Sequence, residues 1–229
     1  MSDYKPLQEV AYDYLRDKIN SGALKPGRIY SEAKIAREIG ASRTPIKDAL
    51  VRLSQDKYVD IIPSRGFCLH ILSEEDILDS YQARIAVEGF CSLYLHMNRS
   101  EREACSVLHE LEKDMNEMER SIEEGRPYSE ILGHDLSFHN RIVRFCGNKE
   151  MIRLYDSYNH QTLEIAIKTF ELLDRPAIAL EEHREIFMNI VSDQISSDWE
   201  VYRSVMKHVE NTKTIVLKVL EEERIKERR

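Results

Sequence analysis

The sequence lacks the features of membrane and secreted proteins. It has no run of 18 apolar residues and no secretory signal, so we expect a cytoplasmic protein. Its four cysteines show no CxxC spacing, which fits a reduced compartment better than a disulfide framework. We expect them to act as small buried apolar residues. They are Cys68, Cys91, Cys105 and Cys146.

Positive charge is also scarce, but only in one part of the chain. The 229 residues carry a net charge of −8, which by itself argues against nucleic-acid binding. Residues 1–72 hold 12 Lys and Arg against 9 Asp and Glu, whereas residues 73–229 hold 21 against 32. A mildly basic first domain followed by an acidic second one suits a DNA-binding regulator. The hydrophobic fraction of 42% supports a substantial core.

Segment 42–53 is the most informative part of the basic domain, because its cations lie at an unusual end of a predicted helix. Ser42 is expected to cap the helix with its hydroxyl group. Arg43, Thr44 and Lys47 then cluster near the N-terminus, where cations oppose the helix dipole. Such a cluster does little for stability, so it predicts contact with DNA. The opposite face carries a buried apolar stripe: Ile46, Ala49, Leu50 and Leu53.

The neighbouring segments complete a winged helix-turn-helix. Residues 31–39 form a short predicted helix that Gly40 ends, directly before the 42–53 helix. A further helix precedes them and ends near residue 22. Two strands are predicted at 58–62 and 67–71, joined by a hairpin whose tip exposes Arg65. Three helices and a two-stranded wing result.

Residues 19–69 resemble the DNA-binding domain of GntR-family transcriptional regulators. The resemblance rests on these matches: Ile19, Gly22, Leu24, Pro26-Gly27, Ser31-Glu32, Ile35-Ala36, Ser42-Arg43-Thr44-Pro45, Ala49-Leu50, Leu53 and Arg65-Gly66. It implies that Ser42, Arg43, Thr44 and Lys47 contact DNA and that Arg65 and Gly66 enter the minor groove. Lys47-Asp48 replaces the more usual Arg-Glu pair, which weakens a bidentate guanine contact.

Glycine and proline become rare after residue 73, and a helical period dominates the remaining sequence. We expect an all-helical antiparallel bundle, a fold that builds ligand and metal sites in its interior. Capping-box patterns begin at Ser73, Ser100 and Ser197. Asp174-Arg175-Pro176 is interpreted as a break between helices. The predicted helices span 74–97, 101–124, 129–146, 149–172, 177–195 and 198–226.

Four polar residues of this domain lie on predicted apolar faces. Asp135 and His139 are four residues apart, so both point to the same side of one helix. His183 and His208 continue the apolar stripes of two other helices. One carboxylate and three imidazoles are ligands for a divalent transition metal of the zinc, nickel or manganese class. The alternative is that each is a hydrogen-bonded core residue.

The span from about 75 to 220 resembles the FCD-type effector domain of the FadR subfamily. The resemblance rests on the quartet above and on Gly147-Asn148 and Glu182-His183. It implies a metal held by the quartet and a small-molecule effector. The His183–His208 span is longer than the family pattern, with the extra stretch at 195–197. Arg84 and Glu88 match a family pair, in which Arg84 either clamps a substrate carboxylate or forms an internal salt bridge.

Together these features predict a ligand-responsive repressor, not an enzyme. We expect a homodimer that binds a palindromic operator and responds to a small carboxylate in a metal-containing pocket. One alternative keeps the regulator but gives it a metal-free pocket for a larger acyl or sugar-acid ligand. Another is a metal phosphohydrolase, since His134-Asp135 is an HD dipeptide.

Overall fold

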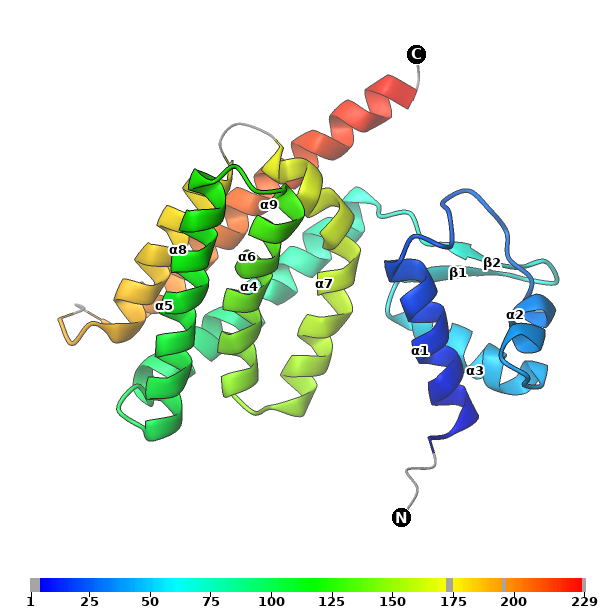
Figure 1. Ribbon diagram of the computed structural model, residues 1–229, viewed down its shortest axis with the longest axis horizontal. Helices are drawn as coiled ribbons and strands as arrows, with labels where there is room; N and C mark the ends of the chain where they lie inside the picture. The colour runs from blue at the N-terminus through cyan, green and yellow to red at the C-terminus, as the bar shows by residue number, and fades with distance from the viewer. Residues whose placement is uncertain (1–4, 172–174, 195–196, 228–229) are drawn as a thin grey trace. The chain divides into compact units, whose positions relative to one another are not determined.

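The computed structural model describes residues 5–171, 175–194 and 197–227 (Figure 1). The chain divides at residue 72 into two compact units, 1–72 and 73–229. Within the described residues, the elements are three helices, two strands and then six further helices, which confirms the predicted fold class. No helix in that part of the chain combines the length and the apolar character needed to cross a lipid bilayer.

The first unit is a winged helix-turn-helix. Strands β1 and β2 pair antiparallel, with Val59 opposite Leu69 and Ile62 opposite Gly66. The predicted apolar stripe of the 42–53 helix is fully buried and packs into the core of this unit. The elements are α1 (Leu7–Asn20), α2 (Glu32–Glu38), α3 (Arg43–Gln55), β1 (Val59–Ile62) and β2 (Gly66–Leu69).

The wing is tied to the segment before α2 by a contact that the sequence did not predict. Tyr30 and Phe67 exchange two backbone hydrogen bonds, of 2.7 and 3.0 Å. The neighbouring Gly66 has a φ of +125°, and a Cβ at this position would lie 2.0 Å from the Tyr30 carbonyl oxygen. Only glycine fits here, because any side chain would push the two backbones apart.

Ser42 stands at the N-cap of α3 as predicted, but its hydroxyl makes no capping hydrogen bond. One of the two usual donors for such a bond is missing. A serine cap accepts a hydrogen bond from the second or third helical N–H. The third residue of α3 is Pro45, which has none. The exposed Ser42 hydroxyl therefore remains available to an external group.

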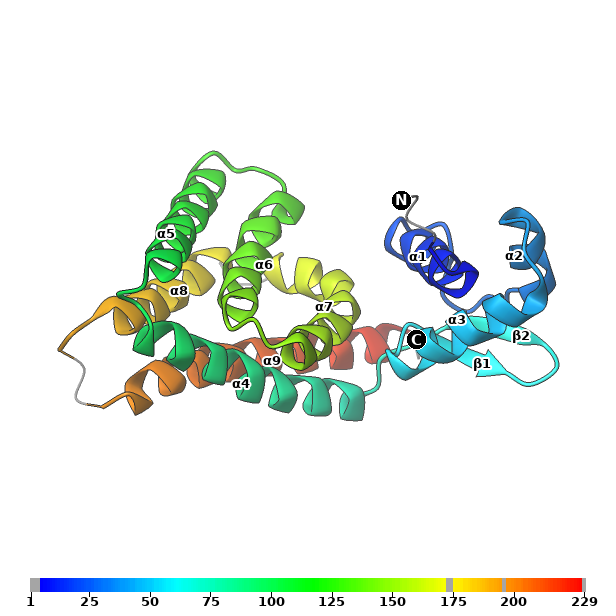
Figure 2. The same ribbon diagram turned by 90° about the horizontal axis from the view of Figure 1, so that it is seen from below.

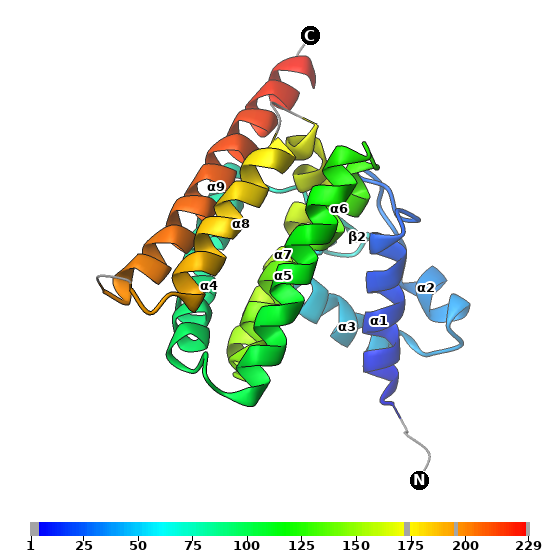
Figure 3. The same ribbon diagram turned by 60° about the vertical axis from the view of Figure 1, so that its left-hand side comes forward.

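The second unit is a helical bundle, and its interior holds an unusual set of polar groups. Helix α4 packs along α9, and α5 packs along α6 (Figure 2). Helix α8 lies beside α9 and also contacts α5 (Figure 3). The helices are α4 (Glu74–Met97), α5 (Arg102–Glu123), α6 (Tyr128–Phe145), α7 (Lys149–Phe170), α8 (Arg175–Val191) and α9 (Trp199–Glu227). The buried polar residues among these helices include Arg84, Glu88, His139, Arg175, Glu182, His183 and His208.

Two predicted helix starts are wrong in detail. Ser73 forms the predicted capping box: its hydroxyl accepts from the Asp76 amide, while the Asp76 carboxylate accepts from the Ser73 amide. Helix α5 is capped at Glu101 rather than Ser100. Ser197 accepts a hydrogen bond from the Trp199 amide, so α9 begins one residue later than predicted.

Helix α8 differs most from its prediction of 177–195. It begins at Arg175, inside the predicted break, and ends at Val191. Proline is accepted in the first turn of a helix, so Pro176 belongs to the start of α8 rather than to a linker. The other predicted breakpoint, Asp174, and residues 195–196 of the proposed insertion lie outside the described residues.

Candidate functional site

Three histidines from three helices meet inside the bundle. His139 lies on α6, His183 on α8 and His208 on α9, and each is at most 3% exposed. The Nε2 atom of His139 lies 3.0 Å from Nε2 of His183 and 3.1 Å from Nε2 of His208. Within the described residues, these three offer ligand atoms that all lie within 4.8 Å of one another.

The spacing of the Nε2 atoms fits a metal ion. With metal–nitrogen bonds of about 2.1 Å, two nitrogen ligands lie roughly 3.0 Å apart at a right angle and roughly 3.4 Å apart at a tetrahedral angle. The two observed separations, 3.0 and 3.1 Å, fall in or near this range. Three neutral imidazoles with converging lone pairs repel one another unless a proton or a cation lies between them.

In two of the three histidines, a carboxylate lies beside Nδ1, the ring nitrogen that is not directed at the other histidines. Nδ1 of His139 lies 2.9 Å from Oε2 of Glu88, and Nδ1 of His208 lies 2.7 Å from Oε2 of Glu182. The Glu182 contact is a hydrogen bond that keeps the proton on Nδ1 of His208 and leaves its Nε2 lone pair free for a metal. The Glu88 contact with His139 has ion-pair distance but not hydrogen-bond geometry. Histidine ligands of metals in proteins are almost always oriented in this way.

The surroundings of His183 and His208 favour neutral rings, and those of Glu88 and Glu182 favour charged carboxylates. Burial lowers the pKa of His183 and of His208, and the neighbouring His139 lowers both further. Burial alone would raise the pKa of Glu88, but Arg84 and His139 outweigh it and hold that pKa well below its usual range. In the same way His208 and Arg175 overcome burial and lower the pKa of Glu182 to about 2.

Asp135, the fourth predicted ligand, lies beside the histidine cluster but is not among the described residues whose ligand atoms all lie within 4.8 Å of one another. Its Oδ1 atom is 3.4 Å from Nε2 of His183, on the same side of α6 as His139. The side chain of Asp135 is 13% exposed, so it is the most accessible of the four predicted ligands. Phe138 stacks on the ring of His183, with centroids 4.5 Å apart and planes 10° apart. This stacking restricts the orientation of the His183 ring.

Arg84 forms the internal salt bridge that the sequence left as one of two options. Its Nε atom donates to Glu88 Oε1 over 2.7 Å, and Glu88 in turn reaches His139. Arg84 is therefore linked to the histidine cluster through one carboxylate. Its guanidinium group also lies 5.1 Å from the ring centroid of Tyr81.

Arg175 is the site residue that sequence reasoning missed. Its Nη2 atom donates to Glu182 Oε2 over 2.9 Å and to Thr212 Oγ1 over 2.7 Å. Glu182 also accepts from Asn211 Nδ2 through its other oxygen. The seven-residue spacing between Arg175 and Glu182 places both on one face of a helix, a signal hidden by the break assigned to Asp174-Arg175-Pro176.

Other candidates of the sequence are not brought into this site. Among the described residues, the histidine cluster does not include His134, the first residue of the HD dipeptide. The four cysteines are free thiols, and only Cys91 is buried, so the expectation that all four are buried is wrong. Cys105 lies on the exposed face of α5, and the other two are half-buried.

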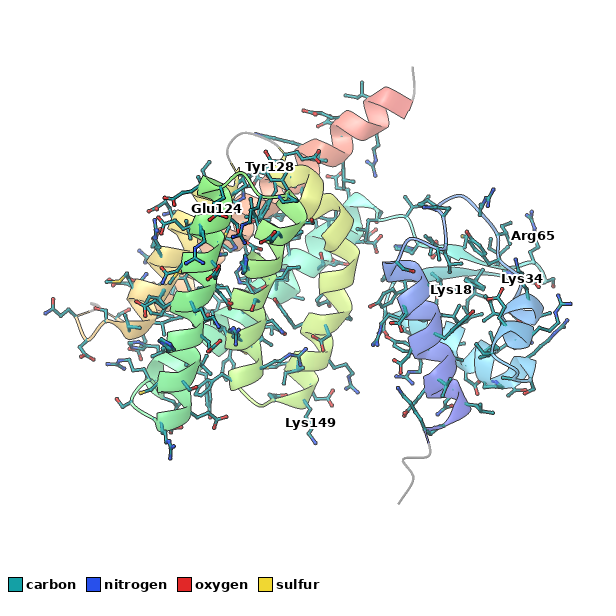
Figure 4. The ribbon with its side chains drawn as sticks, viewed as in Figure 1. Lys18, Lys34, Arg65, Glu124, Tyr128 and Lys149 are labelled. Carbon is teal, nitrogen blue, oxygen red and sulfur yellow. The ribbon has the colours of Figure 1, made fainter. Side chains whose placement is uncertain are left out.

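The predicted DNA-binding residues gather on one face of the first unit. Ser42, Arg43, Thr44 and Lys47 are all exposed at the start of α3. A surface hollow brings Arg43 and Lys47 together with Arg65 and Gly66 of the wing. Arg65 is exposed at the hairpin tip (Figure 4). The hollow is also lined by Ser31, Glu32, Ala33 and Ser64.

Known proteins resemble the chain along most of its length. The uncharacterized HTH-type transcriptional regulator YdhC of Bacillus subtilis (strain 168) is 28% identical over 195 residues, 83% of this chain and 85% of YdhC. The gluconate operon transcriptional repressor of Bacillus licheniformis is 26% identical over 193 residues, 84% of this chain and 72% of the repressor. The solved structure of E. coli McbR/YncC has the same fold, with a TM-score of 0.70 at 15% identity over 95% of this chain and 100% of that one.

Two family descriptions divide the chain between them. Residues 7–69 match the bacterial regulatory proteins of the gntR family, and residues 79–210 match the FCD domain. The first match covers α1 to β2, and the second covers more than half of the chain, including all three clustered histidines. The chain therefore belongs to the GntR family of bacterial transcriptional regulators, with an FCD domain after its winged helix.

Proposed function

We propose that this regulator is a repressor and that a small carboxylate, bound beside a metal ion in the FCD domain, controls its affinity for the operator. The observation that carries the proposal is the cluster of His139, His183 and His208. Nε2 of His139 lies 3.0 Å from Nε2 of His183 and 3.1 Å from Nε2 of His208, and carboxylates lie beside Nδ1 of two of the three rings. A histidine cluster with carboxylates beside its Nδ1 atoms suits a divalent ion of the zinc, nickel or manganese class.

Asp135 would supply the fourth ligand of the ion. It lies close to His183, and its partial exposure leaves room for a ligand from outside. A bound divalent ion would supply a strong attraction for an anionic oxygen. The relative named for the gluconate operon is consistent with an organic acid as effector.

At the DNA end, we assign the contacts to the exposed start of α3 and to the wing. Arg43, Thr44 and Lys47 would meet phosphates and base edges, with the uncapped Ser42 hydroxyl as a further donor. Arg65 and Gly66 would enter the minor groove. A homodimer would place two copies of α3 on the half-sites of a palindromic operator. The effector would favour one dimer geometry and so change operator affinity.

Metal content tests the centre of the proposal. Purified protein should carry about one transition-metal ion per chain, and His183→Ala should lose it, because a remaining His pair binds weakly. His109→Ala removes an exposed histidine of α5 and should leave the metal content unchanged. If His183→Ala holds as much metal as the wild type, the metal site is wrong. The alternative hypothesis, a metal-free pocket for a larger acyl or sugar-acid ligand, would then be preferred.

DNA binding tests the assignment of the DNA contacts to the start of α3. Fluorescence anisotropy on the DNA upstream of the gene should show salt-sensitive binding that Arg43→Ala weakens by roughly tenfold or more. Arg120→Ala changes the net charge equally but lies on the exposed face of α5, so it should bind as the wild type does. Equal binding by both variants would reject the role of α3.

A further inference from the structure

Arg175 is the largest side chain of the structure that is fully buried, at 2% exposure. Only one of its three nitrogens is engaged. Nη2 donates to Glu182 and to Thr212, whereas Nε and Nη1 are buried without a hydrogen-bond partner among the described residues. Thr212 lies one helical turn beyond His208 on α9, and its hydroxyl donates to the His208 carbonyl. Arg175 thus stands directly beside the histidine cluster.

The acceptors next to Arg175 are already occupied. Glu182 accepts from His208 and Arg175 through Oε2 and from Asn211 through Oε1. A buried guanidinium group with unsatisfied N–H donors is costly, since each donor loses its hydrogen bonds to water. An arrangement of this kind is maintained where a ligand supplies the missing acceptors.

The charges around the cluster define what that ligand is. Among the described residues linked to the three histidines, Arg84 and Arg175 carry two positive charges and three carboxylates carry three negative ones. The carboxylates are Glu88, Asp135 and Glu182. The net charge of these groups is therefore −1, and a bound divalent metal ion would change it to +1. A ligand with a single negative charge restores neutrality in a buried site, where an unbalanced charge is expensive.

We propose that Arg175 binds the effector through its free Nε and Nη1 donors, and that the effector is an organic acid with one negative charge. The inference rests on the proposed function and adds to it a specific residue and a charge class. Arg175 acts on the ligand itself, whereas Arg84 is engaged by Glu88.

Calorimetric titration of the full chain loaded with zinc tests the inference. The probes are lactate and gluconate, which carry one charge, and malonate and succinate, which carry two. The single-charge acids should bind the wild type more tightly than the double-charge acids. Arg175→Gln should weaken their binding by about tenfold or more, the usual effect of losing a hydrogen bond to a charged group.

Thr212→Val is the matched control. It removes the hydroxyl that accepts from Nη2 but leaves Nε and Nη1 in place, so acid binding should stay within about threefold of the wild type. Arg175→Lys is made in parallel because Arg175→Gln leaves Glu182 without its cationic partner and can unfold. Lysine keeps the charge but supplies one nitrogen, so it should also bind at least about tenfold more weakly. Zinc content and the helical circular dichroism signal should match the wild type in every variant compared.

The outcomes separate the inference from the proposed function. Acid binding that is equal in wild type, Arg175→Gln and Arg175→Lys overturns the role of Arg175 alone. Tighter binding of succinate than of lactate and gluconate overturns the charge class. If no acid binds the zinc-loaded wild type, the carboxylate effector fails as well. In the wild type itself, an arginine Nε–H resonance that shifts on addition of lactate supports the inference without any substitution, and the absence of such a shift contradicts it.

Discussion

At the scale of single residues, Glu182 connects the histidine cluster to Arg175. One of its oxygens lies 2.7 Å from His208 Nδ1 and 2.9 Å from Arg175 Nη2. It therefore orients His208, a proposed metal ligand, and also neutralises the buried Arg175. Partners of this kind behind a metal ligand affect metal affinity almost as strongly as the ligand itself.

Glu182→Gln should accordingly lower zinc affinity by about 10- to 100-fold, because the amide no longer holds the Nδ1 proton of His208 as strongly. Competition with a chromogenic chelator, performed well below the melting temperature, measures the affinity. Glu185→Gln is the control, since Glu185 lies on the exposed face of the same helix and pairs with Lys207. A loss of affinity in both variants would point to a general charge effect.

Gly66 controls the local geometry of the wing. Gly66→Ala should destabilise the first unit by roughly 2 kcal/mol or more, because the new Cβ meets the Tyr30 carbonyl at 2.0 Å. Gly27→Ala also has a positive φ, of +73°, which lies in the left-handed helical region, and it has open space around the Cβ. It should cost about 1 kcal/mol. Urea unfolding of the two variants compares them, and equal losses would show that the Tyr30 contact yields easily.

At the scale of elements, some helix caps make side-chain hydrogen bonds to the first turn and others make none. The Ser73 capping box satisfies two backbone donors at the start of α4. Ser73→Ala should therefore lower the free energy of unfolding by about 1 kcal/mol. Ser100→Ala should leave it almost unchanged, since α5 is capped at Glu101 without a side-chain hydrogen bond. Thermal unfolding followed by circular dichroism measures both, and a larger effect at Ser100 would contradict the assignment.

The elements themselves could be predicted from the sequence more fully than the site could. Helical and strand periodicities placed every element within a few residues, because burial of one face leaves a repeating pattern. The Tyr30–Phe67 bridge could not be predicted, since a two-residue pairing over 37 positions leaves no periodic trace. Arg175 was missed for a related reason: an Arg-Pro pair indicates a break until its partner on the next helical turns is known.

The candidate ligands were predicted from inward-facing polar residues and from family resemblance. The structure brings His139, His183 and His208 together, despite the long span before the last one. Their roles as metal ligands stay a prediction, as do the assignments of Asp135 and Arg84. Which carboxylate stands behind which histidine depends on packing between α4, α6, α8 and α9, and no local pattern encodes it.

At the scale of the whole molecule, metal should stabilise one unit only. The histidine cluster belongs entirely to the second unit, so a metal ion bound there adds free energy to that unit by mass action. At a free zinc concentration about 100 times the dissociation constant, the gain is about 2.7 kcal/mol. Differential scanning calorimetry of the full chain should show that a chelator lowers the transition of residues 73–229 and leaves that of the winged helix in place. A chelator that shifts both equally would show that the units unfold together.

The positions of the three histidines along the chain also determine when the site forms during folding. His139 is separated from His183 by 44 residues and from His208 by 69. Closing loops of this length costs chain entropy, so the cluster assembles only after α6, α8 and α9 have docked. Stopped-flow kinetics should therefore show refolding rates that are independent of zinc and unfolding rates that zinc slows. A bound ion would then act late in folding: it would not start the folding of residues 73–229, but it would slow their unfolding.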